Sequence, residues 1–313
     1  MSEDRILYLS QQDVASVGLS MAEVIDLLAT ANQEKGHGRI EMPPKPGIHP
    51  GGGDNFIHAM PAYIAAMQAA GMKWVSGFPG NQAKGLPYIT GLLILNDPET
   101  GIPISVMDCI WITAMRTAAA SALSAKHLAR VESSKLGVLG CGVQGFTNTS
   151  ALQVIFNLEE VFAYDLVPEA IEQFNQKVES QLDLKVIPVN SPQEAVTGCD
   201  LIVTAGPILK EPHKTIKAGW MDEGAFASLV DFDSYWDPAA LKESSKFCTD
   251  DHKQFAYYKS VGYFQDVPPL HADLGELEVG KKPGRESPQE RTMACNLGLA
   301  LNDMAVAPTI YQR

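Results

Sequence analysis

Residues 135–145, KLGVLGCGVQG, decide the fold of this chain. The apolar run from Leu136 to Leu139 predicts a buried strand, and Gly140, Gly142 and Gly145 follow it with the spacing GxGxxG. In such a turn the first glycine permits the tight bend, the second lets backbone approach a pyrophosphate, and the third lets the next helix pack on the strand. The stretch predicts the start of a dinucleotide-binding sheet; the alternative is the same turn without a cofactor.

The residues around this turn indicate which dinucleotide it would hold. Val143 and Gln144 open the predicted helix, where backbone N–H groups donate to phosphates. The second predicted strand ends at Asp165, whose carboxylate would accept the ribose hydroxyls of NAD and repel the 2′-phosphate of NADP. We therefore expect NAD as the cofactor, with NADH preferred over NADPH.

Strands and helices alternate after the turn. Strands are expected at 159–165, 185–189, 200–206 and 224–231, with helices at 168–182 and 191–199 between them. This alternation predicts an α/β fold with a Rossmann-type, doubly wound parallel sheet. Ligands of such sheets bind at the carboxyl ends of strands, which makes the end of the strand DLIVTAG a cofactor contact. That end consists of Thr204, Ala205 and Gly206.

The segments before and after this sheet show a different pattern of predicted strands and helices. Closely spaced strands at 56–64, 71–78, 88–97 and 103–109 predict a largely antiparallel sheet, and an alanine-rich helix follows at 112–130. The tail at 296–311 predicts a last helix. We therefore expect the Rossmann domain, residues 126–293, to be inserted into an α+β substrate-binding and dimerisation domain formed by 1–125 plus 294–313.

Composition excludes several classes of protein. The 313 residues are 45% hydrophobic and carry a formal net charge of -13, which disfavours nucleic acid as a partner. No stretch approaches the roughly 18 apolar residues of a membrane span, and the N-terminus MSEDRILYLSQQDVA lacks the apolar core of a signal peptide. Five cysteines without CxxC spacing predict reduced thiols in a cytoplasmic protein and no bound metal.

Five stretches show that the chain resembles the ornithine cyclodeaminase/mu-crystallin family. They are GMKWVSGFPGN, AMRTAAASALSAKHLA, GVLGCGVQG, and DLGELEVGKKPGR followed by NLGLALNDMAVA. The resemblance implies a homodimer whose N-terminal domains form the interface, with NAD or NADP in the Rossmann half. It also implies one of the family's activities: cyclodeaminase, alanine dehydrogenase, imino acid reductase, or ligand binding in the manner of mu-crystallin.

The resemblance also implies a clamp for a substrate carboxylate, made by Arg39, Lys73 and Arg116. Arginine binds a carboxylate through two parallel hydrogen bonds, whereas lysine supplies a point charge. Lys73 lies in an apolar strand and is also a candidate for proton transfer; the alternative is a strand residue that faces solvent. Arg116 has a structural ion pair as its alternative. Thr117, beside it, resembles the family's cofactor-contacting position, although threonines here also cap helices.

Two positions depart from the cyclodeaminase pattern. His58 replaces the glutamate that holds the amine of ornithine, so it would bind a carboxylate or carbonyl, shuttle protons, or be a plain buried histidine. The catalytic aspartate of the cyclodeaminases corresponds to Asp231 or Asp233 in SLVDFDSYWDP, which lacks the usual Pro-Gly-Lys. Asp231 is preferred because it lies at the carboxyl end of a strand.

These observations predict an NAD(H)-dependent imino acid reductase, equivalently an L-amino-acid dehydrogenase, that acts on a small 2-oxo or imino acid. One alternative is an ornithine or lysine cyclodeaminase with recycled NAD. Another is a non-catalytic ligand-binding protein in the manner of mu-crystallin. The sequence does not name the amino or imino acid.

Overall fold

The computed structural model describes residues 6–313, apart from the side chain of Gln82, and divides into two compact units. Unit 1 comprises the chain up to Arg116 together with Gly298–Arg313, and unit 2 comprises Thr117–Leu297. Residues 1–5, which carry part of the argument against a signal peptide, lie outside the described residues.

The units divide at 116/117, inside helix α3 (Ile110–Leu128), and at 297/298, whereas the sequence predicts divisions at 125/126 and 293/294. The first half of α3 holds Arg116, which is ion-paired to Asp303 within unit 1. The second half holds Ser121, whose hydroxyl is hydrogen-bonded to Ser228 of unit 2 at 2.9 Å. One long helix therefore contributes to two cores.

Unit 1 is built on a seven-stranded sheet in the order β1-β7-β6-β5-β4-β2, with β3 paired to β4. All pairs are antiparallel except β1 with β7, which confirms a largely antiparallel sheet. Its strands are β1 (Leu7–Leu9), β2 (Ile40–Glu41), β3 (Gly47–Ile48), β4 (Phe56–Ile64), β5 (Ala69–Gly77), β6 (Ile89–Asn96) and β7 (Pro103–Asp108). Short helical segments are α1 (Gln11–Ser16), η1 (Ala65–Met67) and η2 (Pro79–Lys84).

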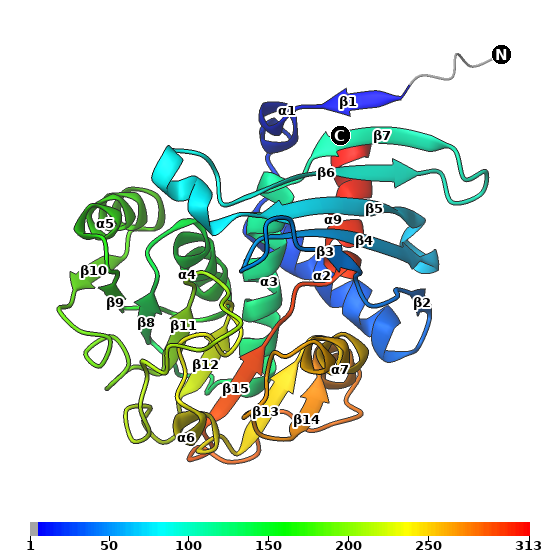
Figure 1. Ribbon diagram of the computed structural model, residues 1–313. Coiled ribbons are helices and arrows are strands. Elements are labelled where there is room, and N and C mark those ends of the chain that lie inside the picture. The colour runs from blue at the N-terminus through cyan, green and yellow to red at the C-terminus, as the bar shows by residue number, and fades with distance from the viewer. Residues whose placement is uncertain (1–5) are drawn as a thin grey trace. The chain divides into compact units, whose positions relative to one another are not determined.

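Two helices cover one face of this sheet. Helix α9 (Ala300–Gln312) packs on β4 and β5, and α2 (Met21–Gly36) packs on α9 (Figure 1). A capping box between Ser20 and Glu23 starts α2. Alternate residues of β4 and β5 are buried against α9, and register places Lys73 of β5 opposite Met60 of β4. The alternation of β5 therefore directs the side chain of Lys73 toward the core of unit 1.

Unit 2 contains an eight-stranded, wholly parallel sheet, which confirms the α/β prediction (Figure 1). The order is β10-β9-β8-β11-β12-β15-β13-β14. Its strands are β8 (Lys135–Leu139), β9 (Glu160–Tyr164), β10 (Lys185–Pro188), β11 (Leu201–Thr204), β12 (Phe226–Leu229), β13 (Lys246–Thr249), β14 (Leu270–Asp273) and β15 (Thr292–Cys295).

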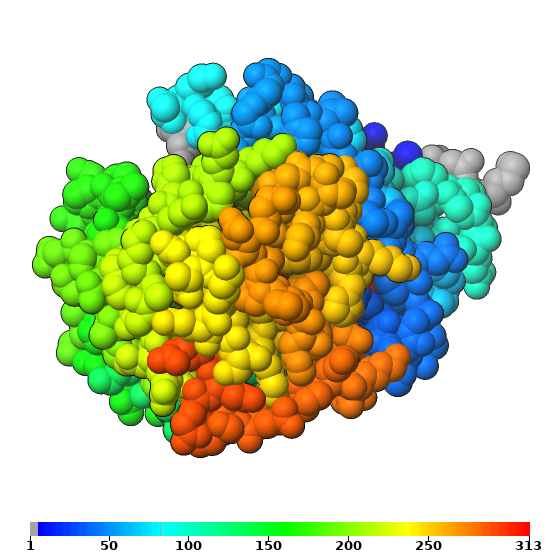
Figure 2. Space-filling view, turned by 60° about the horizontal axis from the view of Figure 1, so that its bottom comes forward, coloured from blue at the N-terminus to red at the C-terminus, as the bar shows by residue number. Residues whose placement is uncertain are grey.

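The helices of unit 2 are α4 (Val143–Ile155), α5 (Pro168–Leu182), α6 (Pro238–Leu241), α7 (His252–Ser260) and α8 (Leu274–Glu278). The chain from β13 to α8, yellow to orange in Figure 2, forms a continuous part of the surface of this unit. The helix expected at 191–199 is wrong: these residues form turns, and Gly198 ends them with a left-handed φ of 81°. None of the helices in the described part of the chain combines the length and the apolar character of a membrane span.

Gly137 in β8 provides a test of this packing. A Cβ at this position would lie 1.8 Å from the carbonyl oxygen of Ala195, a backbone atom. We expect Gly137→Ala to lower the free energy of unfolding by roughly 1–3 kcal/mol, the usual cost of overpacking, as measured by urea denaturation. Gly80→Ala is the control because no atom lies within 4 Å of its added Cβ. Equal stability of both variants would contradict the strand packing described here.

Candidate functional site

The buried face of unit 1 holds a cluster of charged side chains. Lys73 Nζ lies 2.7 Å from Asp303 Oδ1, and both side chains are fully buried. Arg116 Nε lies 3.2 Å from the same oxygen, and Lys73 also donates to Thr113 Oγ1 at 3.3 Å. One carboxylate on α9 therefore gathers a lysine from β5 and an arginine from α3. The sequence predicted both cations but missed Asp303.

The ammonium of Lys73 is in an unusual electrostatic state. Burial and the nearby Arg116 lower its pKa to about 8, while Asp303 acts in the opposite direction. An amine with this pKa exchanges protons near physiological pH, as a general acid or base must. The alternative that Lys73 faces solvent is therefore wrong, because its side chain has no exposed surface.

Lys45 is a third cation of this region, and the sequence did not predict it. It is 8% exposed, and its Nζ donates to the carbonyl oxygen of Gly298 at 3.0 Å. The guanidinium of Arg116 lies against the same glycine: a Cβ on Gly298 would be 2.6 Å from Arg116 Nη1. Gly298 has a φ of 77° and no side chain, so Lys45 and Arg116 can both approach its backbone closely.

Arg39, the third residue of the predicted clamp, lies in a different arrangement. Its side chain is 57% exposed, and its Nε and Nη2 donate to Glu34 at 2.7 and 2.5 Å. Its guanidinium is therefore paired with Glu34, whereas Lys73 and Arg116 are paired with Asp303. Geometry favours Lys45 over Arg39 as the partner of these residues.

His58 lies beside this cluster on the buried face of β4. Its ring stacks on Phe56 with centroids 4.4 Å apart, and a Cβ on Gly47 of β3 would collide with it. Burial lowers the pKa of His58 to about 3, and the charges of Lys45, His49 and Lys73 act in the same direction. His58 is therefore neutral at physiological pH, which argues against a proton shuttle there.

In unit 2 the glycine turn has the geometry that the sequence predicts. Gly140 has a φ of 102°, and a Cβ on it would lie 2.7 Å from the backbone of Ala205; on Gly145 it would lie 2.2 Å from Gly140 O. These two glycines are required by the protein itself. A Cβ on Gly142 would meet nothing within 4 Å, so that glycine leaves open space in front of the turn.

The start of α4 fits a phosphate. Its N-cap is Gly142, which supplies no side-chain hydrogen bond, and Val143 next to it is 62% exposed. No side chain therefore caps the first-turn N–H groups, which leaves them for an anion. Gln144 lies behind them, where its Oε1 accepts from Asn148 at 3.2 Å. Thr117 is half-buried in α3, as part of unit 2.

Asp165 follows β9 and is tied to the turn. Its Oδ2 accepts from the backbone N–H of Cys141 at 2.8 Å, and its Oδ1 accepts from that of Val167 at 3.0 Å. A carboxylate held beside the second glycine can accept hydrogen bonds from the ribose hydroxyls of a bound dinucleotide. The structure thus gives Asp165 a role in shaping the turn that the sequence did not reveal.

The two candidate aspartates after β12 are separated by the structure. Asp231 is 1% exposed; its carboxylate accepts from Thr204 Oγ1 at 2.6 Å and from the N–H of Gly206 at 2.9 Å. Burial raises its pKa to about 7. Asp231 therefore joins the carboxyl ends of β11 and β12, where the sequence predicts a cofactor contact. Trp236 donates to the same threonine at 3.3 Å.

Asp233 faces a different space. It lines a cavity of about 120 Å³ together with side chains that include Lys210, Phe264 and Asp266. Burial raises the pKa of Asp233 to about 6, and the like charge of Asp266 adds to the rise. The cavity of Asp233 is lined by neither Thr204 nor Gly206. Asp231, which contacts both, is therefore the better candidate for a role at the cofactor.

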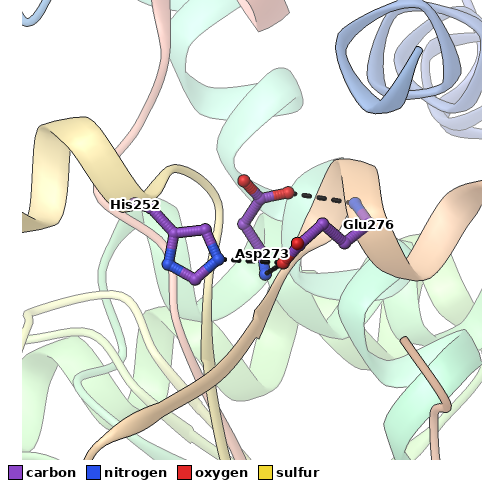
Figure 3. Close-up of side chains that lie close together, drawn as sticks. All are labelled: His252, Asp273 and Glu276. Carbon is purple, nitrogen blue, oxygen red and sulfur yellow. Dashed lines mark hydrogen bonds and ion pairs between the residues drawn. The ribbon is translucent and has the colours of Figure 1, made fainter. Parts of the chain in front are cut away.

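A histidine and two carboxylates come together elsewhere in unit 2, as Figure 3 shows. The ligand-type atoms of His252, Asp273 and Glu276 lie within 4.8 Å of one another. Asp273 and Glu276 form the capping box of α8, and His252 Nε2 is hydrogen-bonded to Glu276 Oε2 at 2.8 Å. Each carboxylate accepts from the backbone N–H of the other residue, so helix capping explains the cluster.

Known proteins resemble this chain over almost its whole length. Alanine dehydrogenase of Archaeoglobus fulgidus is 38% identical over 318 residues, which cover 98% of this chain and 94% of the relative. The structure of Thermococcus litoralis Δ1-pyrroline-2-carboxylate reductase, solved with NADH and L-proline, matches with a TM-score of 0.88 and 32% identity. It covers 98% of this chain and 97% of the other.

An archaeal alanine dehydrogenase dimer with bound NAD matches with a TM-score of 0.85 and 36% identity, over 98% of this chain and 95% of that one. The model of the ornithine cyclodeaminase/mu-crystallin family matches residues 6–313. The resemblance seen in the sequence is confirmed, and the chain belongs to the ornithine cyclodeaminase/mu-crystallin family.

Proposed function

We propose that the protein is an NAD(H)-dependent imino acid reductase, equivalently an L-amino-acid dehydrogenase, for a small 2-oxo or imino acid. The buried cluster of unit 1 carries this proposal: Lys45, Lys73 and Arg116 contribute three positive charges, and Asp303 contributes one negative charge. An excess of buried positive charge is stabilised by an anion that hydrogen-bonds to it, and a carboxylate matches both arginine and lysine.

Each residue of the cluster has a part in this reaction. Lys45 and Arg116, joined at Gly298, bind the substrate carboxylate and so fix the position of its Cα. Nicotinamide, when bound, supplies the hydride that the imine carbon receives. Lys73 supplies the proton that the imine nitrogen needs, because a lysine with a pKa of about 8 holds a transferable proton near neutral pH.

We propose that unit 2 binds the cofactor through Gly140, Gly142, Gly145 and the first turn of α4. Asp165 favours NADH over NADPH because its carboxylate would lie against the extra 2′-phosphate. Asp231, Thr204 and Gly206 form the end of the site at the carboxyl edge of β11 and β12. A cytoplasmic location is supported by five cysteines that are all buried and free.

His58 argues against ornithine or lysine as the substrate. A side-chain ammonium needs a fixed anion, whereas a neutral imidazole among three cationic or titratable neighbours offers none. The cyclodeaminase alternative therefore lacks a residue that would hold the second amine. A substrate with a smaller or uncharged side chain suits the neutral ring of His58.

The activity is tested by the loss of NADH absorbance. We expect purified protein to oxidise NADH with Δ1-pyrroline-2-carboxylate, or with pyruvate plus ammonium, and to use NADPH at least about tenfold less efficiently, since a repelled phosphate costs 1.4 kcal/mol or more. The control is L-ornithine with catalytic NAD, assayed for ammonia. Ammonia release from ornithine without net NADH change would establish the cyclodeaminase instead, and tight ligand binding without any turnover would establish a binding protein.

Lys45 and Arg39 form a matched pair of variants for the carboxylate clamp. Lys45→Met should raise KM for the imino acid by about 10–100-fold, because a hydrogen bond to a charged group contributes about 1.5–3 kcal/mol. Arg39→Met should change KM by less than about threefold, since an exposed ion pair contributes little. Steady-state kinetics of both variants decide the matter. A larger effect at Arg39 would return that residue to the clamp.

We also propose that unit 1 forms a homodimer through the sheet face that α2 and α9 leave uncovered. Trp74 and Leu92 are direct neighbours in the β5–β6 register on this face, and they are 44% and 51% exposed. Ile48 of β3 is 55% exposed. Large apolar side chains on an open antiparallel sheet are typical of a subunit interface. The dimeric alanine dehydrogenase neighbour supports a dimeric state.

Light scattering after size-exclusion chromatography tests the dimer. The wild type should have twice the mass of one chain, and Trp74→Glu combined with Leu92→Glu should give the mass of one, because each charge would be buried without a partner. Val131→Glu is the control, since Val131 is 89% exposed in unit 2. A dimer that survives the double substitution places the interface on another surface.

A further inference from the structure

We propose that Asp303 is a positioning residue that keeps the buried Lys73 ammonium protonated and fixes its direction, so that the lysine can deliver its proton to the imine nitrogen. The inference rests on the proposed reductase function and deepens it. Its starting point is geometry: Asp303 Oδ1 lies 2.7 Å from Lys73 Nζ, and both side chains have no exposed surface.

The position of Asp303 in the chain suits a counter-ion. It lies in the first turn of α9, where the partial positive charge of a helix N-terminus stabilises a carboxylate. The residues that follow it, 304–307, are apolar and buried, and the helix packs on β4 and β5, so the carboxylate lies at the buried face of the sheet. A carboxylate in such a helix is costly unless a cation meets it there.

The hydrogen bonding of this carboxylate is one-sided. Both cations lie at Oδ1, whereas Oδ2 is buried and accepts no hydrogen bond among the described residues. Arg116 Nε, although close to Oδ1, is likewise without a hydrogen bond of good geometry. A structural ion pair would normally satisfy its remaining lone pairs. The close contact that Asp303 does make is directed at Lys73, the residue with a part in proton transfer.

The charges that face Lys73 show why a counter-ion is needed. Arg116 on α3 repels the ammonium, and burial penalises its charge. His58 on β4 is neutral, and burial raises the pKa of the Cys109 thiol to about 11, so neither supplies an anion at neutral pH. Thr113 provides only a hydroxyl. Asp303 is therefore the anion that offsets these effects.

Loss of Asp303 should move the pH dependence of the reaction. Reduction requires protonated Lys73, so kcat/KM falls as pH rises through its pKa of about 8. In Asp303→Asn we expect this fall to occur roughly 1–3 pH units lower, which is the usual effect of an opposite charge at this distance. Asp303→Glu retains the charge and should return the fall toward the wild-type pH, with kcat still lowered by the changed geometry.

Asn302→Ala is the matched control on the same helix. Asn302 is also fully buried, but its Oδ1 accepts from Asn32 on α2 at 3.4 Å rather than from Lys73. This variant should lose stability and keep the wild-type pH profile. The proposal is overturned if Asp303→Asn folds and keeps the wild-type profile, or if Asn302→Ala moves it equally.

A second measurement does not depend on turnover. In protein labelled with carbon-13 at the lysine ε-carbon, the Lys73 resonance, assigned through Lys73→Arg, should titrate near pH 8 in the wild type and lower in Asp303→Asn. If Asp303→Asn does not fold, Asp303→Glu decides: titration near pH 8 with a lowered kcat supports the proposal, whereas an unchanged kcat overturns it. Wild-type protein without turnover on any imino acid refutes the reductase function alone, because the resonance still reports on Asp303.

Discussion

An ammonium and a carboxylate that are both fully buried depend on each other, because removal of either partner leaves an uncompensated charge that costs roughly 3–5 kcal/mol. Lys73 and Asp303 are such a pair, and they connect β5 to α9 at the centre of unit 1. Arg116 adds α3 to the same oxygen. The helix that leads from unit 1 into unit 2 is therefore attached to the sheet through charge as well as through apolar packing.

The same interaction explains why this region suits a carboxylate substrate. Asp303 contacts two of the three buried cations, Lys73 and Arg116, and Lys45 meets Arg116 at Gly298. If the acid neutralised more of them, the attraction for an anion would be lost; if it were absent, the ammonium of Lys73 would lose its proton more readily. Partial neutralisation gives both a place to bind and a proton to transfer.

Local patterns made most of the fold predictable, whereas the site depended on contacts distant in sequence. The strands β4 to β8 follow from alternation or short apolar runs, and the glycine spacing follows from one turn. The placement of β15 between β12 and β13 has no local signal, because it is set by packing of segments far apart in the chain. The sequence predicted Arg39 instead of Lys45 because a motif shows only which residues are neighbours along the chain. It does not show which of their side chains is buried. Asp303 did carry a signal: it is an acid within the apolar run LGLALNDMAVA.

The glycine turn shows how structure separates what the fold needs from what a ligand needs. Gly140 and Gly145 are required whether or not a cofactor binds, because a Cβ at either position would meet backbone atoms. Gly142 has an ordinary negative φ and empty space before it, so protein packing gives no reason for a glycine there. A side chain at this position would instead occupy the space in front of the uncapped N–H groups of α4. The residue that the fold leaves unexplained is thus the one that a bound pyrophosphate explains, and this favours cofactor binding over a purely structural turn.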